Sequence, residues 1–482
     1  MEPVLPFAVA LPRGSGRMAQ ALHALLRTAI LDGRLAPGAA LPATRRLALE
    51  LGVARNTVTT AYDLLVAEGY VLPHRGAKAV VARLAMRRAA RPASSRALED
   101  TRLNPIWRTP HLRQEPARDL PERCFRLGVP EHRQFPHAIW RRLSARTLRA
   151  WSKQRFAYPP SEGIPELREA IAQHVAFTRA VACTADDVLV TSGAQQAFDL
   201  LARLLVTRGR TCVAVEDPGY PPARATFIAA GARLAAVPVD AEGLCVEALP
   251  KDARIICVTP SHQSPTGVAL SARRRLALLD FARRHDAVVI EDDYDAEFRF
   301  GGRPLDALQT LDRDDRVFYV GTFSKSLFPA LRKGFVVAPV WARDALAGVK
   351  HCADSHSDIL TQATLAAFIR DGHLARHVRR MHALYAGRRN ALLEGLRNEL
   401  AEWFEPVPSE AGMHLAARIR KPAMAGSIFR LAGECVPGAQ SIADYAMSKP
   451  VQPMLTFGYG VIDADEILLA LRRFRKALER MG

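Results

Sequence analysis

The chain has 482 residues, of which 49% are hydrophobic and 24% are charged. This length predicts roughly two to four folding units of ~100–200 residues, and the lack of an uncharged apolar run of ~18 residues excludes a typical membrane span and favours a soluble, cytoplasmic protein. The formal charge of +18 favours a polyanionic partner such as nucleic acid, although ordinary solvated surface charge would also explain it.

The seven cysteines form no C-x-x-C pair, so we expect neither a metal site nor a disulfide framework. Residues 1–119 carry 18 basic and 9 acidic side chains, so half of the net charge lies in the first quarter of the chain.

This first quarter is predicted to hold three helices and two short strands. Residues 18–32 show the three-and-four apolar spacing of an amphipathic helix. A short helix capped by Thr44 follows, and a third helix is expected from about residue 54 to 68. Residues 71–82 predict two short strands around a His-Arg-Gly turn.

The predicted second and third helices have the arrangement of a helix-turn-helix, in which the start of the second helix of the pair meets base edges while other groups bind phosphates. Arginine can pair with guanine and asparagine with adenine, and a glycine turn can enter a minor groove. A small helical domain with a basic face is the alternative interpretation. The candidate DNA contacts are Arg45, Arg46, Arg55, Asn56, Thr57, Arg75 and Gly76.

Residues 83–121 are rich in Arg, Ala and Pro, and they predict a mobile or partly helical linker. From residue 122 onward, apolar runs such as VLVTSG, VAVEDPG, IICVTPS, VVIEDDY and VFYVGTFS alternate with helical patterns. This alternation predicts an α/β domain with a mainly parallel sheet covered on both faces. We therefore expect domains at 1–82 and 122–482, joined by the linker.

The stretch GTFSKSLFPALR indicates a site for a phosphorylated aldehyde. Lys325 follows an apolar strand that would deliver it to the carboxyl end of the sheet, where α/β proteins bind ligands. A partly neutral lysine amine condenses with aldehydes. Arg332, Thr322 and Ser324 offer donors for a phosphate. A merely solvated lysine is the alternative for this stretch alone.

Three further stretches add to this hypothesis. In VVIEDDY, strand alternation places Asp292 and Tyr294 on one face, where a carboxylate could hold a pyridine nitrogen protonated. The amides of Ala194 and Gln195 open a helix and would point toward an anion. Tyr220 follows another strand and could stack on a flat ring. An acidic strand end and a core tyrosine are the alternatives.

The N-terminal pattern LPATRRLALELGVARNTVTTAYDLLVAEGY resembles the winged helix-turn-helix of GntR-type regulators. Residues 122–482 resemble the fold type I, pyridoxal-phosphate-dependent aminotransferases, including a small C-terminal α+β subdomain. The whole chain is similar to the MocR subgroup of GntR regulators, and SGAQQ, EDPGYP, TPSHQ, IEDDYD and GTFSKSLFP are markers of that subgroup.

This resemblance implies roles for particular residues. Lys325 would be the Schiff-base lysine, Asp292 the partner of the pyridine nitrogen, Tyr294 a donor to the ring oxygen and Tyr220 the stacking ring. Ala194, Gln195, Thr322, Ser324 and Arg332 would bind the phosphate. Tyr158 occupies the place of a tyrosine that reaches the neighbouring subunit's phosphate, and Ser264 replaces the usual asparagine on the ring oxygen.

One departure from the aminotransferase pattern affects the expected function. Aminotransferases fix the substrate's α-carboxylate with an arginine near the last strand of the small domain, but between Cys435 and Ala470 the only basic residue here is Lys449. Arg418 and Arg420 are candidate substitutes. Without such an arginine, amino-acid turnover should be poor.

The resemblance implies a homodimeric transcription regulator that binds operator DNA and uses pyridoxal 5′-phosphate to sense an amine, an amino acid or the cofactor itself. A working aminotransferase with an accessory DNA-binding segment is the main alternative. A DNA-binding protein whose second domain has lost the cofactor is another.

Overall fold

The computed structural model describes residues 5–7, 11, 17–73, 79–83, 101–109, 112, 119–153, 157–295, 297–301, 305–448 and 452–481. The chain divides into two compact units, Met1–Arg108 and Thr109–Gly482. None of the helices in these described ranges combines the length and the hydropathy that crossing a membrane requires.

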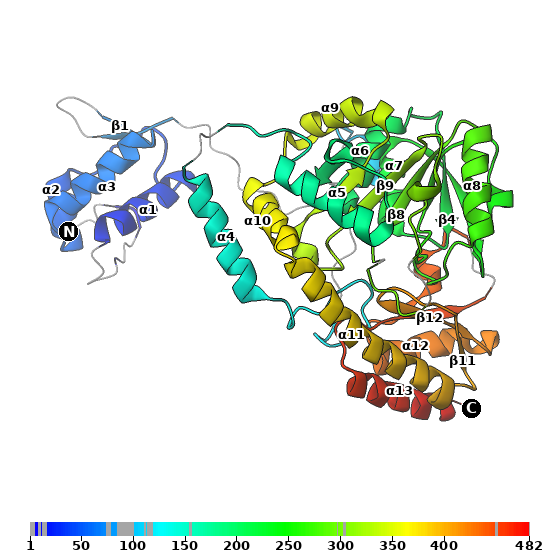
Figure 1. Ribbon diagram of the computed structural model, residues 1–482. Coiled ribbons are helices and arrows are strands. Elements are labelled where there is room, and N and C mark those ends of the chain that lie inside the picture. Colours follow the sequence, from blue (N-terminus) through cyan, green and yellow to red (C-terminus); the bar gives the residue numbers. More distant parts are fainter. Residues whose placement is uncertain are drawn as a thin grey trace. The chain divides into compact units, whose positions relative to one another are not determined.

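The N-terminal unit contains three helices and a two-stranded antiparallel ladder (Figure 1). Its core is built from the apolar faces of the helices, among them Leu22, Leu26, Val58 and Leu65. The expected order of elements is confirmed, but Thr44 is the first helical residue rather than a side-chain cap. The elements are α1 Met18–Leu31, α2 Thr44–Leu51, α3 Arg55–Ala67, β1 Val71–Leu72 and β2 Val80–Val81.

The second unit contains an eight-stranded sheet in the order β3-β10-β9-β8-β7-β4-β5-β6. Strands β9, β8, β7, β4 and β5 run parallel, whereas β10 and β6 are antiparallel to their neighbours. The expected mainly parallel sheet is therefore confirmed. Its strands are β3 Val188–Thr191, β4 Cys212–Asp217, β5 Arg233–Asp240, β6 Gly243–Leu244, β7 Ala253–Val258, β8 Val288–Asp293, β9 Val317–Thr322 and β10 Gly334–Val337.

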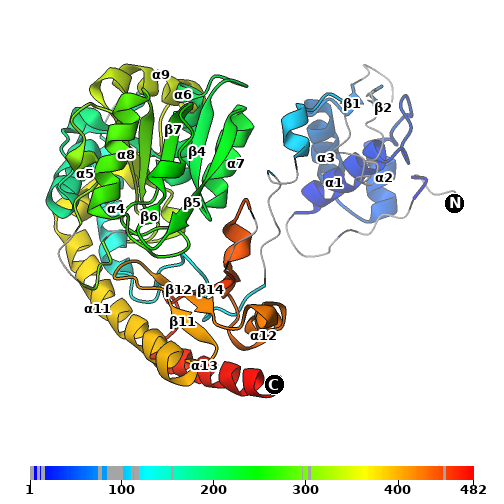
Figure 2. The ribbon, with the colours of Figure 1, turned by 90° about the vertical axis from the view of Figure 1, so that its right-hand side faces the viewer.

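Helices cover both faces of this sheet (Figures 1 and 2). Strand alternation explains the division, because Val188 and Val190 pack into one core while the intervening Leu189 packs into the opposite one. Helices α5, α8 and α10 cover the first face, and α6, α7 and α9 cover the second. The helices are α4 His137–Trp151, α5 Pro165–Arg179, α6 Ala194–Leu205, α7 Pro221–Ala230, α8 Ala272–Arg284, α9 Arg343–Asp354 and α10 Ile359–Arg370.

A smaller antiparallel sheet lies in the C-terminal part of this unit, in the order β11-β12-β14-β13 (Figure 2). Its apolar face packs on three helices around Leu415, Phe457, Leu392 and Phe474. The expected small α+β subdomain is confirmed. Its elements are α11 His373–Glu394, β11 Phe404–Pro406, β12 His414–Ile419, α12 Ala425–Cys435, β13 Gln440–Ser441, β14 Met454–Gly458 and α13 Ala464–Glu479.

Candidate functional site

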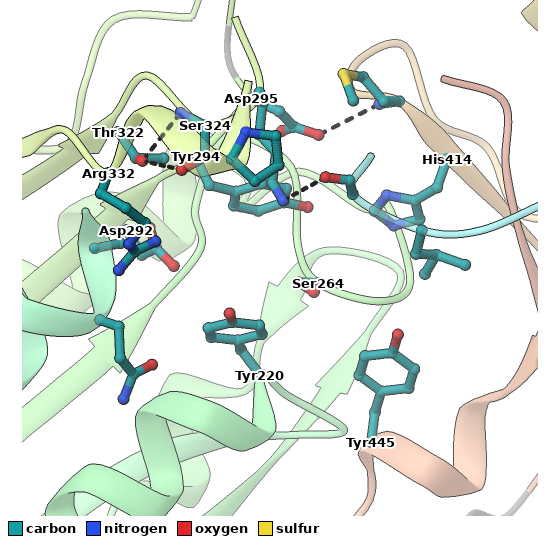
Figure 3. Close-up of a pocket in the computed structure, with 17 residues that line it drawn as sticks. Tyr220, Ser264, Asp292, Tyr294, Asp295, Thr322, Ser324, Arg332, His414 and Tyr445 are labelled. Atoms are coloured by element: carbon teal, nitrogen blue, oxygen red, sulfur yellow. Dashed lines mark hydrogen bonds between the residues drawn. The ribbon is translucent and has the colours of Figure 1, made fainter. Parts of the chain in front are cut away.

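A cavity of about 340 Å³ opens where the central strands of the large sheet end. It gathers ten of the eleven residues that the sequence predicts for a cofactor site (Figure 3). Such a position at the carboxyl ends of parallel strands is where α/β proteins bind ligands. The ten residues are Ala194, Gln195, Tyr220, Ser264, Asp292, Tyr294, Thr322, Ser324, Lys325 and Arg332.

Lys325 follows the end of β9, and its amine donates a 2.6 Å hydrogen bond to the carbonyl oxygen of Gly128. Burial lowers the pKa of this amine, and the nearby carboxylates of Asp295 and Asp292 oppose the shift. A lysine with a lowered pKa is more often neutral and therefore more nucleophilic than an exposed one. The cavity thus holds an amine suited to attack a carbonyl group.

Asp292 and Asp293 are adjacent on β8 but face different surroundings. Asp292 lines the cavity, and burial, followed by repulsion from Asp293, raises its pKa to about 8. Its Oδ1 atom has no hydrogen-bond partner in the part of the chain that the structure describes. Asp293 instead accepts 2.7 Å hydrogen bonds from Arg179 and from the Tyr319 hydroxyl. A cationic nitrogen in the cavity would satisfy Asp292, whereas Asp293 is already satisfied.

An anion cradle forms between the end of β3 and the loop after β9. Gly193 has φ +84° and precedes the first amides of α6, and a Cβ at this position would lie 3.0 Å from the Arg332 guanidinium. A larger residue would therefore fill the space in front of Arg332. The Thr322 hydroxyl donates a 3.0 Å hydrogen bond to the Ser324 hydroxyl beside it. Helix amides, hydroxyls and a guanidinium together suit a phosphate.

The remaining predicted residues divide into two groups. Tyr220 immediately precedes α7 and lines the cavity together with Ser264 and Tyr294, and the Tyr294 hydroxyl lies 3.1 Å from the Nδ1 atom of His262. Tyr158 lies apart from the cavity, with 90% of its surface exposed. Its expected role belongs to a neighbouring subunit, so a single chain leaves it untested.

The structure adds residues to the cavity wall that the sequence did not single out, including Asp295, Met413 and His414. Asp295 is buried, and one of its carboxylate oxygens lies 3.0 Å from the Nδ1 atom of His262, which lies behind it. His414 Nε2 lies 3.0 Å from the Pro265 carbonyl oxygen. His262 and Asp295 belong to the motifs TPSHQ and IEDDYD, which the sequence analysis named. The turn after β8 ends the strand alternation, so the sequence pattern does not give the direction of the Asp295 side chain.

The two arginines proposed as substitutes for a carboxylate-binding arginine do not line the cavity. β12 begins at His414, beside the cavity, and Arg418 lies near its far end, where it pairs with Met454. Arg420 is half exposed, and its guanidinium lies 4.0 Å from Glu405. The structure therefore brings neither arginine to the cavity, because β12 leads Arg418 away from it and Arg420 follows the last residue of that strand.

In the N-terminal unit, α3 begins at Arg55 and presents Arg55 and Asn56 to solvent, while Thr57 is half-buried. Arg45 and Arg46 lie exposed on α2. The five side chains therefore lie at the start of the expected recognition helix and on the helix before it. Arg75 and Gly76 lie outside the described residues.

Comparison with known families assigns both units. Residues 18–81 match the model for bacterial regulatory proteins of the gntR family, and residues 126–435 match the model for aminotransferase class I and II. The probable rhizopine catabolism regulatory protein MocR of Rhizobium meliloti is 38% identical over 481 residues, which cover 96% of this chain and 95% of that protein. The chain belongs to the MocR subgroup of GntR-family transcriptional regulators.

Other members of this subgroup are also similar. The HTH-type transcriptional regulator TauR of Rhodobacter capsulatus is 37% identical over 82% of this MocR-type chain and 83% of its own length. The pyridoxine biosynthesis regulator PdxR of Corynebacterium glutamicum is 33% identical over 82% of both chains. A GntR-type helix-turn-helix binds DNA, and DNA is therefore a partner of this MocR-type regulator.

Solved aminotransferases share the fold of the second unit. LysN, the α-aminoadipate aminotransferase of Thermus thermophilus, solved with N-(5′-phosphopyridoxyl)-L-leucine, matches with TM-score 0.67 and 29% identity, over 74% of this chain and 92% of that one. The Pyrococcus horikoshii kynurenine aminotransferase matches with TM-score 0.68 and 25% identity, over 74% and 90%. The cofactor of this MocR-type regulator is pyridoxal 5′-phosphate.

Proposed function

We propose that this MocR-type regulator senses a primary amine, an amino acid or pyridoxal 5′-phosphate itself in its aminotransferase-like unit and changes its affinity for operator DNA in response. The proposal rests on one observation. The same chain contains a cavity suited to a cofactor and a helix whose exposed first residues are suited to reading DNA. A ligand can act in this way only by binding two arrangements of the protein with different affinity.

When bound, pyridoxal 5′-phosphate supplies an aldehyde that condenses with primary amines and a ring that withdraws electrons. Lys325 would hold the cofactor covalently, since burial lowers the pKa of its amine. Asp292 would bind the pyridine nitrogen, which its unpartnered Oδ1 atom supports. Tyr220 would stack on the ring, and Tyr294 and Ser264 would bind the ring oxygen.

The phosphate would lie against the start of α6 and the loop after β9. The amides of Ala194 and Gln195 point out of the helix start, where the helix dipole favours an anion. Arg332 adds a guanidinium, and Thr322 and Ser324 add hydroxyls. Thr322, Ser324 and Arg332 lie on the same side of the cavity (Figure 3).

We also propose a homodimer in the cytoplasm. Tyr158, which the resemblance assigns to the neighbouring subunit's phosphate, is 90% exposed in the single chain and is therefore accessible to a second copy. A two-fold dimer would match two half-sites on DNA, and chromosomal DNA lies in the cytoplasm of a bacterium. Sedimentation equilibrium of the holo-protein would give a single species of twice the chain mass, and a monomer would contradict the proposal.

A working aminotransferase remains the second candidate, because the cavity lies in a fold shared with active enzymes. In the described part of the cavity wall, Arg332 is the only arginine, and it belongs to the proposed phosphate end. An amino-acid substrate would then lack a guanidinium partner for its carboxylate. The sensor function is therefore favoured over multiple turnover.

The test measures DNA affinity and turnover on the same holo-protein. Fluorescence anisotropy with a duplex that the protein selects from a random library would show an affinity that changes on adding an amine. The Lys325→Ala variant would bind the same duplex without the response. Many turnovers of an amino acid with a keto acid, together with unchanged DNA affinity, would contradict the proposal.

A further inference from the structure

Gln196 lies in the first turn of α6, directly after the two residues whose amides are proposed to bind the phosphate. Its neighbours Ala194 and Gln195 line the cavity, whereas Gln196 is not part of the described cavity wall. The Oε1 atom of Gln196 accepts a 2.7 Å hydrogen bond from the Ser192 amide, and its Nε2 atom donates a 2.8 Å hydrogen bond to Oδ2 of Asp354, on α9. The side chain therefore links the backbone of the anion cradle to a second helix.

The backbone of Ser192 is held through both of its polar groups. Its amide donates to Gln196, and its carbonyl oxygen accepts a 2.5 Å hydrogen bond from the Arg332 guanidinium. Gly193 follows with φ +84°, and α6 begins at the next residue. Because the first amides of a helix bind an anion only when they point at it, the way this short segment is held sets the direction of the phosphate donors.

Asp354 determines which way the Gln196 amide group points. An ionised carboxylate only accepts hydrogen bonds, so it binds the NH₂ group of the amide and leaves the amide oxygen for Ser192. Burial alone would raise the pKa of Asp354, but hydrogen bonds from Lys350 and Gln196 lower it, and the group is ionised near pH 7. The Lys350 side chain is fully buried and forms an ion pair with Asp354. A buried charge thus holds the carboxylate that orients Gln196.

We propose that Gln196 is a positioning residue for the cofactor phosphate, and that Asp354 and Lys350 act through it. Gln196 holds the Ser192 backbone so that the first two amides of α6 point at the phosphate, and it does not touch the phosphate itself. This inference rests on the proposed function, in which the phosphate lies at the start of α6. A link that only stabilised the packing of α6 on α9 would affect folding without favouring a phosphorylated ligand.

The test compares pyridoxal 5′-phosphate with pyridoxal, which lacks the phosphate. The full-length protein, freed of cofactor, is titrated with each compound, and the absorbance change gives two dissociation constants whose ratio is the phosphate preference. Gln196→Met keeps the length of the side chain but makes neither hydrogen bond. Its phosphate preference falls roughly tenfold or more, as expected for one lost hydrogen bond to a charged group, while its affinity for pyridoxal is unchanged.

Further variants assign the effect to this chain of contacts. Gln173→Met makes the same replacement at an exposed position on α5, outside the cavity, and keeps the wild-type preference. Lys350→Met combined with Asp354→Leu removes the acceptor together with its buried cation, so no buried charge is left unpaired. This double variant loses the phosphate preference, and adding Gln196→Met lowers it no further, because both changes break the same link. A double variant that keeps the full preference, or losses that add, would overturn the role of Asp354 and Lys350.

The outcomes separate this inference from the proposed function. A wild type that binds both compounds equally would contradict the proposed phosphate site and, with it, this inference. If the wild type prefers the phosphate and Gln196→Met retains that preference, or loses affinity for both compounds equally, the inference alone is overturned. Should Gln196→Met fail to fold, Gln196→Asn replaces it, since its shorter side chain does not span from Ser192 to Asp354. The same loss is expected there, and a retained preference would overturn the inference.

Discussion

The Nδ1 atom of His262 lies 3.0 Å from a carboxylate oxygen of Asp295, and both side chains are buried. The two residues are 33 positions apart in the chain, and Asp295 lines the cavity while His262 lies behind it. The pair depends on Gly412, which packs against the His262 ring and has φ +81°. A Cβ at Gly412 would overlap this ring and lie 2.7 Å from Asp295 Oδ2.

Gly412→Ala should therefore destabilise the second unit. Overpacking and the left-handed backbone together predict a loss of about 2–4 kcal/mol in the free energy of unfolding. Gly426→Ala is the matched control, since a Cβ in that part of α12 would meet no atom within 4 Å and should be neutral or stabilising. Urea unfolding followed by circular dichroism measures the stability of both variants. If Gly412→Ala were as stable as Gly426→Ala, the His262 ring would move aside without cost.

The adjacent carboxyls of β8 give opposite predictions. Asp292→Asn removes a buried carboxyl group whose pKa is raised to about 8, so the cofactor-free protein should lose no stability at pH 7, while cofactor affinity falls. Asp293→Asn weakens a buried ion pair with Arg179 and should cost roughly 3–5 kcal/mol. Unfolding curves and cofactor titrations distinguish the two. A large stability loss in Asp292→Asn would show that this residue supports the fold instead.

Acid stability should depend on Glu131. Burial alone would raise the pKa of this carboxyl group, but hydrogen bonds from Arg133 and Arg388 lower it to about 2. Its stabilisation is therefore fully present above about pH 4.5 and is lost as the pH falls toward 2, and it amounts to roughly 3 kcal/mol.

The Glu131→Gln variant should differ most from the wild type near pH 7, and the difference should shrink on acidification. The exposed Glu434→Gln on α12 is the control, because a surface ion pair contributes little. Unfolding free energies measured from pH 7 to pH 2 test this. If the difference in unfolding free energy between the wild type and Glu131→Gln grew on acidification, its sign would be wrong and the proposed role of this ion pair would be excluded.

DNA recognition should depend on the first turn of α3. Arg55 is exposed at the start of this helix, and Arg55→Ala should weaken binding to the selected duplex by about 1–3 kcal/mol if it contacts a base. Arg430→Ala removes the same charge from the surface of α12 and should leave the affinity unchanged. Anisotropy titrations at fixed salt measure both, and equal losses would indicate a general charge effect without base contact.

Residues that follow a predicted strand could be assigned from the sequence. Lys325 and Asp292 each lie at or just beyond the end of an apolar run, and parallel strands bring such ends to one edge. The strand β10 was missed because it follows directly on the stretch assigned to the cofactor. Its antiparallel pairing with β3 and β9 carries no local signal.

Contacts between the large sheet and the smaller one could not be predicted. His414 reaches the cavity only because β12 begins beside the Pro265 loop, and this packing depends on the whole tertiary fold. The same packing explains why Arg418, four residues along β12, is carried away from the site. Asp295 was missed because it lies in the turn after β8, where strand alternation no longer fixes the direction of a side chain.

The most direct test of the central claim is peptide mapping of the holo-protein after borohydride reduction, which makes the cofactor linkage permanent. The account predicts one modified peptide, with the adduct on Lys325, and no adduct in Lys325→Ala. Lys333 provides an internal comparison, because it is buried and burial also lowers its pKa, yet it does not line the cavity. An adduct on Lys333, or none on either lysine, would contradict the account.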